Sequence, residues 1–524
     1  MKKAKPIFIL LLLLTFTFYG TNDSLVKFSE LKFKNSSEKE FFEAYSQQGV
    51  KKDIIDLMLM PYNRDNFFSS VKAHAMIAQF VTELKKETKG MSNAKKVKAV
   101  YKAVHRTFLK VYKLQNSFSD IFEKGEYNCV SSTALFAIVF DKMEIPFRIQ
   151  EQPQHVYITA YPQDESMLIE TTSPDNGYLK LSPTMVQKYV KYLLNNKLIT
   201  QEEYDREPPE SIFAKNYYTS SGIDLAKMPG IQYSNYALYY AEEGNYESAL
   251  EEIKKAYVVD ASLRNKYLLR SILLYALSKT NYKDNNHLDG LLCLSRFNNQ
   301  NDPEINNTVV KNEFSRLMNE VLINNSDEQK TKQAFEAMYG CIQDSSLKND
   351  ISFAYHYELS RLALFNKADP TTTNEHLKIA YHINPKNVNL QGIILSHISN
   401  ALEKSEQPER RLKVLSDYAN TFNFLNDNEQ FVIVVANCQL EMMYRSFFLK
   451  EGKDGEVFLK DFEKLMKSKK DIFPNETAVE KAFSEAAAYY YKLGNTAKTK
   501  SLLKTGLVYA PENFGLKMRL MQVR

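Results

Sequence analysis

Residues 233–256 carry aromatic, small and glycine residues in an order that constrains the fold more than any other stretch of the chain. Apolar residues recur there at the three- and four-residue steps of one helix face. Small residues at Ala237, Ala249 and Ala256 allow two antiparallel helices to approach closely, and Gly244 suits the turn between them. The stretch therefore predicts a helix hairpin whose Tyr and Leu side chains pack between helices.

The same order returns further along the chain. A clear copy comprises Phe483, Ala487, Tyr490, Gly494, Leu503, Gly506 and Pro511. A degenerate copy ends in Leu377, Ala380 and Pro385, and the segments between have helical periodicity with poorer signatures. The pattern resembles the tetratricopeptide (TPR) repeat at its signature places. This resemblance implies an all-α TPR-type solenoid over residues 216–524, with a concave surface that holds a peptide or partner protein.

A different pattern occupies the first part of the chain. Two amphipathic helices are predicted over residues 64–86 and 92–113, and Gly125 and Asn128 then mark a turn and a helix cap. Cys129 follows at the first turn of an apolar helix, where the positive end of the helix dipole lies. His155 lies in a β-like run over 154–161 and Glu170 in a second such run over 167–172.

The chemistry of these three residue types is complementary. A thiol is a useful nucleophile only as thiolate, so it needs a neighbouring imidazole or a helix N-terminus. Two neighbouring strands of one sheet can hold His155 beside Glu170, and the acid would then orient the ring and stabilise imidazolium. A metal site is not predicted, because one Cys and one His lack the paired spacing of zinc ligands. No cofactor is predicted.

Residues Gly125 to Pro174 resemble the core of the transglutaminase-like cysteine-enzyme superfamily. The closer likeness is to bacterial proteins with a Gly-x-x-Asn-Cys-Val/Leu-Ser start, a Pro-x-His-Val strand and an Ile-Glu-Thr-Thr strand, often joined to TPR repeats. The resemblance implies an α+β transglutaminase-like (papain-like) domain over residues 25–215. It implies Cys129 as nucleophile, His155 as base and Glu170 as orienting acid. Gln115 is a weaker candidate for the oxyanion site, after the backbone N–H of Cys129.

Two functions remain open from the sequence. The first is an exported thiol acyl-transfer enzyme, either a peptidase or amidase resolved by water or a transamidase resolved by an amine. The second is a non-catalytic, envelope-associated TPR scaffold with a vestigial transglutaminase-like domain. The repeats occupy more than half of the chain, which favours the scaffold, whereas the intact set of three residues favours the enzyme.

The N-terminus predicts export. Lys2, Lys3 and Lys5 precede an apolar run over residues 7–19, which is shorter than the about 20 residues that span a bilayer. Residues 1–24 are therefore a signal peptide or an uncleaved anchor, and the protein is expected in the periplasm or envelope. The four cysteines are widely spaced and are not expected to pair. A net charge of +5 spread along 524 residues gives no reason to expect nucleic acid.

Overall fold

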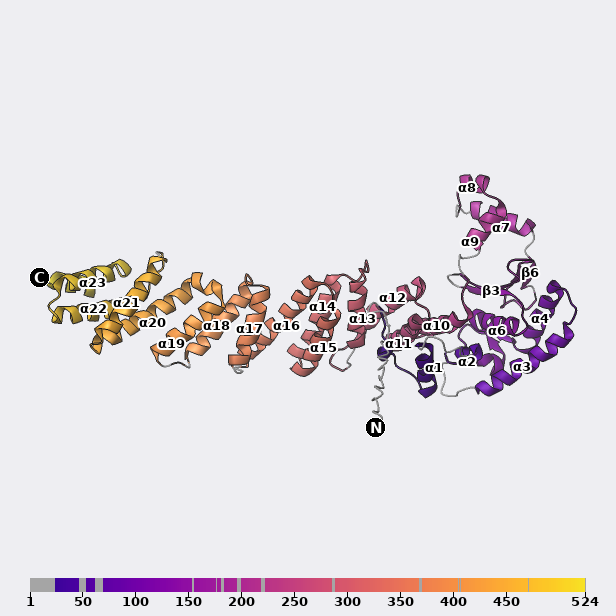
Figure 1. Cartoon of the computed structure of the whole chain (residues 1–524), viewed down its shortest axis with the longest axis horizontal. Coiled ribbons are helices and arrows are strands. Elements are labelled where there is room, and N and C mark those ends of the chain that lie inside the picture. The colour runs from indigo at the N-terminus through magenta and orange to yellow at the C-terminus, as the bar shows by residue number, and fades with distance from the viewer. Residues whose placement is uncertain are drawn as a thin grey trace, which may run out of the picture. The chain divides into compact units, whose positions relative to one another are not determined.

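The computed structural model divides the chain into two compact units, Met1–Asp302 and Pro303–Arg524 (Figure 1). It describes residues 24–46, 53–61, 69–152, 155–175, 177–180, 183–195, 199–217, 222–284, 288–366, 370–403, 405, 407–469 and 471–523. The predicted export signal, up to residue 23, lies outside these residues. Within them, no helix is both long enough and apolar enough to cross a membrane.

The first unit contains a four-stranded antiparallel sheet. Its strand order is β3 (Phe147–Gln152), β4 (His155–Ala160), β5 (Met167–Ile169) and β6 (Tyr178–Lys180). In register, Ile158 of β4 faces Ile149 of β3 and Ile169 of β5. The β-branched residues of β4 and β5 thus build the centre of the sheet, as their sequences predict.

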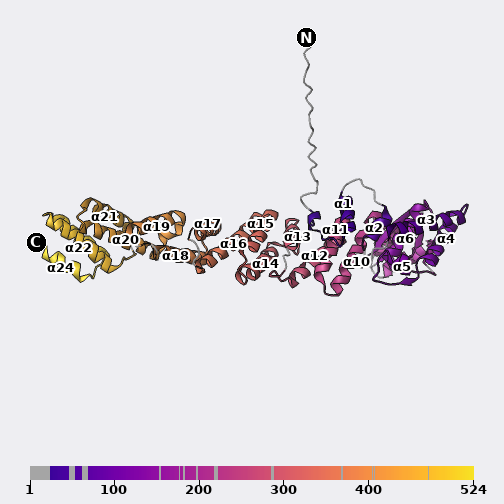
Figure 2. The same ribbon diagram turned by 90° about the horizontal axis from the view of Figure 1, so that it is seen from below.

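Helix α6 (Cys129–Lys142) packs on this sheet and is buried at every residue from Val130 to Phe140. A helix that is apolar on all sides belongs in a protein core. Its other neighbours are α2 (Ile54–Leu59) and α3 (Ser70–Glu87), which share its apolar cluster with α4 (Asn93–Thr107). Figure 2 shows these helices gathered around α6. The Cys helix is therefore the central element of the unit.

Short elements complete the first unit. They are η1 (Phe28–Glu30), α1 (Ser36–Ser46), α5 (Asp120–Lys124), the parallel pair β1 (Val111–Tyr112) and β2 (Glu126–Tyr127), α7 (Pro183–Asn195), α8 (Gln201–Arg206), α9 (Pro209–Tyr217) and η2 (Leu225–Lys227). Helices α7, α8 and α9 have an apolar cluster of their own.

The helix predicted over residues 92–113 ends earlier, at Thr107. Beyond Phe108 the backbone N–H groups of Lys110 and Lys113 donate to the carbonyls of Gly125 and Tyr127, both at 2.8 Å. This pairing competes with further helix, so Val111 lies in β1 and is exposed instead of buried on a helix face. Periodicity within a segment cannot reveal a pairing with a distant segment.

The first predicted hairpin forms as α10 (Met228–Glu242) and α11 (Tyr246–Val259), followed by α12 (Leu263–Lys279) and α13 (Leu288–Asn299). Ala237, Ala249 and Ala256 are fully buried where the two helices of the hairpin meet. Gly244 has a φ of 77°, a conformation that glycine adopts without strain, and it forms the turn between them.

These helices belong to the first compact unit because buried polar pairs bind them to the N-terminal segment. Glu38 is 1% exposed and accepts hydrogen bonds from Tyr233 at 2.9 Å and Lys255 at 3.0 Å. Arg296 of α13 pairs with Glu30 in the same way. The last strand of the described residues ends at Lys180, and the two compact units divide after Asp302, whereas the domain boundary at residue 215 stays a prediction.

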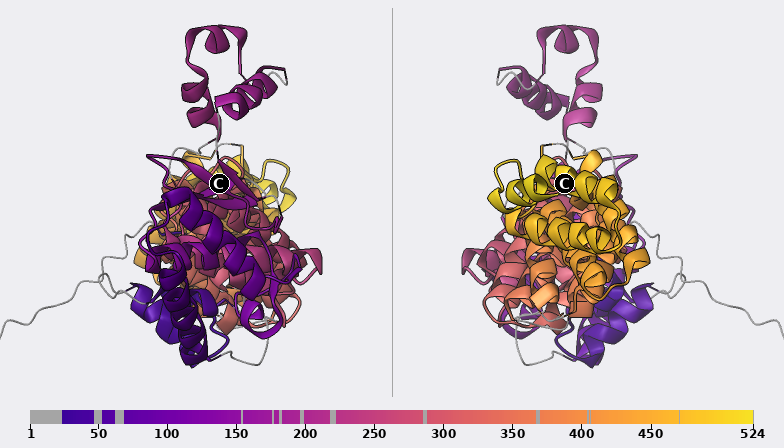
Figure 3. Two further views of the ribbon diagram at one scale, coloured as in Figure 1. Left: turned by 90° about the vertical axis from the view of Figure 1, so that its right-hand side faces the viewer. Right: turned by 90° about the vertical axis from the view of Figure 1, so that its left-hand side faces the viewer.

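The second unit is helical throughout its described residues. Its elements are α14 (Asn307–Leu317), a π-helical turn η3 (Met318–Ile323), α15 (Glu328–Cys341), α16 (Ser345–Phe365), α17 (Pro370–Ile383), α18 (Val388–Glu403), α19 (Pro408–Thr421), η4 (Asn423–Asp427), α20 (Glu429–Phe448), α21 (Gly452–Lys467), α22 (Glu476–Lys492), α23 (Thr496–Tyr509) and α24 (Phe514–Gln522). Consecutive helices pack in pairs, and the last of them lie side by side in Figure 3.

The clear second copy of the pattern forms the hairpin of α22 and α23. Gly506 lets these helices approach closely, because a Cβ there would lie 3.0 Å from Phe483 and 3.1 Å from Leu516. The protein is thus a mostly helical, solenoid-like array of helix pairs with a small sheet in its first unit.

Candidate functional site

Cys129 is the first residue of α6, and Asn128 fixes the start of that helix. The Asn128 side-chain oxygen accepts the N–H groups of Val130 at 3.0 Å and Ser131 at 2.9 Å. Its side-chain nitrogen donates to the carbonyl of Leu114 at 2.9 Å. Such a cap is worth about 1 kcal/mol, and it places the half-buried Cys129 at the positive end of the helix dipole.

His155 and Glu170 meet directly. Nε2 of His155 lies 2.6 Å from Oε2 of Glu170, and the two side chains are 32% and 30% exposed. The second carboxylate oxygen accepts the hydroxyl of Thr172 at 2.6 Å and its N–H at 3.2 Å. Glu170 lies just after β5. One oxygen of its carboxylate bonds His155 and the other bonds Thr172.

Cys129 completes the arrangement. A hydrogen bond with Cys129 is the largest cause that raises the pKa of His155 to about 10, and the bond to Glu170 is the next. Burial opposes both. Burial raises the pKa of Glu170, but the bonds from His155 and Thr172 outweigh it and leave that pKa lowered. An imidazolium between sulfur and carboxylate is the charge state that results at neutral pH.

Two tyrosines that sequence analysis did not single out for the site lie near Cys129. Burial raises the pKa of Tyr112, and it raises that of Tyr239 to about 12. The charge of Cys129 is the second cause in both cases. The Tyr239 hydroxyl donates to the carbonyl of Leu114 at 2.8 Å, the carbonyl that Asn128 also uses. Tyr239 belongs to α10, so the first helix hairpin lies near the thiol. No sequence signal separates Tyr239 from the tyrosines that only pack.

The segment that precedes the Cys helix is exposed. Val111, Tyr112 and Leu114 are at least half exposed in it, and the charged Lys113 between them is exposed as well. Gln115 is exposed, and its part in an oxyanion site stays a prediction. In the described part of the chain, no group of three or more His, Cys, Asp or Glu side chains is placed to hold a metal ion. None of the four cysteines forms a disulfide bond.

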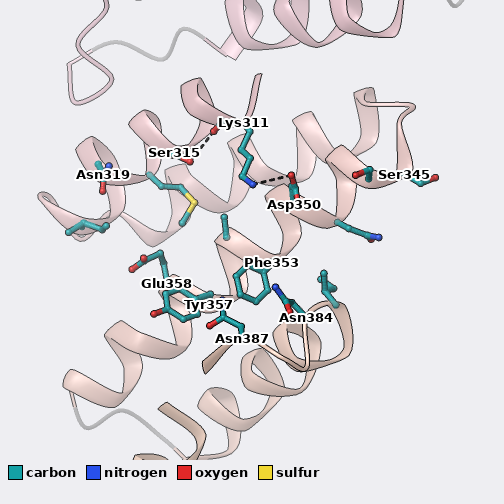
Figure 4. A pocket seen from close by; sticks show the side chains of 16 residues that line it. Lys311, Ser315, Asn319, Ser345, Asp350, Phe353, Tyr357, Glu358, Asn384 and Asn387 are labelled. Atoms are coloured by element: carbon teal, nitrogen blue, oxygen red, sulfur yellow. Dashed lines mark hydrogen bonds and ion pairs between the residues drawn. The ribbon is translucent and has the colours of Figure 1, made fainter. Parts of the chain in front are cut away.

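The second unit has a groove of about 860 Å³ between α14, η3, α16 and the turn that joins α17 to α18 (Figure 4). Its lining is mixed: carboxamides of Asn319, Asn349, Asn384 and Asn387, hydroxyls of Ser315, Ser345 and Ser346, the rings of Phe353 and Tyr357, and a few charged and aliphatic side chains. Lys311 and Asp350 form an ion pair at 3.0 Å across from the two rings. The groove can therefore offer hydrogen bonds and apolar surface with little net charge.

No protein-family model matches this chain, and no curated protein matches it. Among solved structures, the chain is similar to one from the crystal structure of the APC/C hetero-tetramer Cut9–Hcn1. The two share 10% identity, with 93% of this chain and 100% of that chain covered, at a TM-score of 0.17. A TM-score this low carries no argument about fold or function. What is known of this chain therefore rests on its own helix packing and site geometry.

Proposed function

We propose that this protein binds a protein or peptide partner through its helical array, and that its first unit adds a thiol acyl-transfer site. Stacked helix pairs commonly present a surface for an extended partner. The groove of the second unit, at about 860 Å³, has the volume of ligand sites in general, about 300–1,000 Å³. This groove is the observation that supports the binding function.

The lining indicates the class of partner. An asparagine carboxamide offers both donors and an acceptor, as a peptide group does. Phe353 and Tyr357, stacked at 5.6 Å between ring centres, add apolar surface. The charge of Lys311 is already balanced by Asp350. An extended peptide segment of low net charge suits these features best.

Selection of a displayed random peptide library on the full chain tests the binding function. Peptides recovered on the wild type should bind Asn384→Arg about tenfold more weakly, because the new side chain fills the groove. Asn400→Arg is the matched control, since Asn400 is exposed on α18 outside the groove lining. Equal binding by Asn384→Arg and the wild type would place the partner elsewhere.

The thiol site is supported by the bonds that join His155 to Cys129 and to Glu170. In the proposed reaction the Cys129 sulfur attacks an amide carbonyl, and the developing oxyanion is held by the N–H of Cys129. His155 passes its proton to the leaving amine, and an acyl-enzyme forms. Water or a second amine then attacks the thioester, returns a proton to His155 and releases the product. Glu170 keeps the ring oriented and stabilises its charge.

The local fold supports the transglutaminase-like proposal. Helix α6 begins with the cysteine and packs on an antiparallel sheet, His155 begins β4, and Glu170 follows the neighbouring strand β5. This is the order of elements that the resemblance implies. The exposed side chains of Val111, Tyr112 and Leu114 would then contact an apolar substrate side chain next to the scissile bond.

A scaffold without chemistry requires only the helical array, and the helical architecture supports that simpler function more directly. Alkylation by iodoacetamide, followed for each cysteine by mass spectrometry, separates the two. Cys341 serves as internal reference, because it is also half-buried but ends α15, at the negative end of a helix. An active site predicts that Cys129 reacts about 30-fold faster than Cys341 at pH 5, where ordinary thiols are protonated. Equal alkylation rates at the two cysteines would contradict the thiol site, and only the scaffold function would remain.

Export remains a proposal that rests on the composition of residues 1–24. Expression of the full chain with a periplasmic reporter fused at its C-terminus would test it. Reporter activity should be lost when Lys2, Lys3 and Lys5 are replaced and the apolar run is interrupted by charge.

A further inference from the structure

A chain of buried hydroxyls runs behind the thiol site. Ser132 and Thr133 lie on α6, one turn after Cys129, and Thr171 directly follows Glu170. All three are 0% exposed. The Thr171 oxygen lies 2.8 Å from that of Ser132 and 2.9 Å from that of Thr133. The ends of the chain are two carbonyls, with Ser132 2.6 Å from that of Asn128 and Thr133 3.2 Å from that of Val156.

Three residues of this network are adjacent in sequence to a site residue. Asn128 precedes Cys129, Val156 follows His155, and Thr171 follows Glu170. The network therefore joins the three elements that carry the site: the start of α6, strand β4 and the turn after β5. Regular pairing of β5 ends at Ile169, one residue before Glu170. Thr171 links that turn to the Cys helix.

We propose that Thr171 is a positioning residue of the thiol site, holding the turn that carries Glu170 at the distance from α6 at which its carboxylate meets His155. The inference rests on the proposed thiol function and adds to it the side chain that sets the geometry. Misplacement of a reacting group by about 1 Å is enough to cost up to about a hundredfold in rate. A hydroxyl buried among hydroxyls is a restraint of this kind, because breaking it leaves polar atoms without water.

The number of hydroxyl hydrogens shows which substitution leaves the other buried hydroxyls with an acceptor. The hydroxyl of Ser132 also lies 3.5 Å from the carbonyl oxygen of Cys129. These five contacts share only three hydroxyl hydrogens, so at most three of them are hydrogen bonds at any moment. In Thr171→Val, Ser132 can still donate to Asn128 and Thr133 to Val156. No remaining hydroxyl loses its acceptor, so the fold should be retained while the link to the turn is lost. Thr171→Ser keeps that link.

The matched control is Thr159→Val. Thr159 lies in β4, is also 0% exposed, and its hydroxyl has no hydrogen-bond partner among the described residues. The two Thr→Val variants thus make the same change at a fully buried threonine, and only one of them removes a connection to the turn that carries Glu170. Their melting temperatures should be similar.

Full-length wild type and variants are alkylated with iodoacetamide from pH 5 to pH 9, and the rate at Cys129 is read against that at Cys341. In Thr171→Val the Cys129 rate at pH 5 should fall about tenfold, with a smaller change at pH 9, because a displaced Glu170 stabilises imidazolium less. Thr171→Ser should stay within about twofold of wild type and Thr159→Val unchanged. A merely structural role would move melting temperature without this change in the pH profile.

The outcomes separate the inference from the proposed function. If wild-type Cys129 reacts no faster than Cys341 at pH 5, the thiol site itself fails and the positioning role with it. If the wild type is fast and Thr171→Val equally fast, the positioning role alone is wrong. Should Thr171→Val not fold, Ser132→Ala combined with Thr133→Val removes both hydroxyls of α6 that Thr171 contacts. An unchanged pH profile in that variant overturns the inference as well.

Discussion

The start of α6 and the α15–α17 region each contain a half-buried cysteine and a half-buried histidine, yet their electrostatics are opposite. At α6 the thiol begins a helix and His155 bonds a carboxylate, which with Cys129 raises the pKa of the ring to about 10. In the other region Cys341 ends a helix, and Nδ1 of His356 lies 2.8 Å from Nδ1 of His376. Burial, then the neighbouring ring, lowers the pKa of His356 to about 4. Residue type alone therefore does not predict the charge of a histidine, because its burial and its bonding partner together set the pKa of the ring.

Replacement of His155 should reduce the difference between the two regions more than any other change. We expect His155→Ala to slow alkylation of Cys129 at pH 5 about 30-fold, to the level of Cys341, because no cation then stabilises thiolate. His356→Ala is the control and should leave both cysteines unchanged. A Cys129 that stays fast in His155→Ala would show that the helix N-terminus suffices, and the imidazole would lose its assigned role.

Removal of the carboxylate should have a smaller effect. Glu170→Gln keeps the size of the side chain but not its charge, so the Cys129 rate at pH 5 should fall about tenfold. Glu144→Gln, a change at an exposed residue that follows α6, is the matched control. A rate in Glu170→Gln equal to wild type would mean that the acid does not support imidazolium here.

Titration of the rings sharpens the comparison directly. In protein labelled with carbon-13 at histidine Cε1, the NMR signal of His155 should keep its protonated shift until about pH 10, whereas that of His356 should stay neutral down to about pH 4. The variants His155→Gln and His356→Gln assign the two signals. A His155 signal that titrates near its ordinary value of about 6.5 would contradict the bonds proposed for it.

The pH dependence of stability should differ between His155 and His356 in the same sense, and this effect should be the smallest. The pKa of His155 is raised in the fold, so its contribution is fully present below about pH 6.5 and is lost as pH rises towards about 10. The pKa of His356 is lowered, so its contribution is present above about pH 6.5 and is lost as pH falls towards about 4. We expect changes of about 1–3 °C in melting temperature across each window. The corresponding His→Gln variant should flatten its own window and leave the other unchanged.

Much of the thiol site follows from local sequence. Asn128 predicts the start of α6 because its short carboxamide caps a helix, and the structure has that cap. The β-branched runs predict β4 and β5, and the glycine and small residues predict the hairpins of α10 with α11 and α22 with α23. Each of these depends on interactions among residues a few positions apart, so each can be read from a window of sequence.

Contacts between distant segments were decided only by the tertiary structure. They end α4 at Thr107, bring Tyr239 and the Leu114 carbonyl to the thiol, and join Thr171 to Ser132 and Thr133. They also bind Glu38 to Lys255 and so place the first hairpins in the same compact unit as the sheet. Helix capping, hydrophobic periodicity and turn formation depend on residues that are close in sequence, so they can be predicted from the sequence alone. The packing of the whole core decides which buried hydroxyls bond to one another. It also decides which tyrosine lies near the sulfur of Cys129.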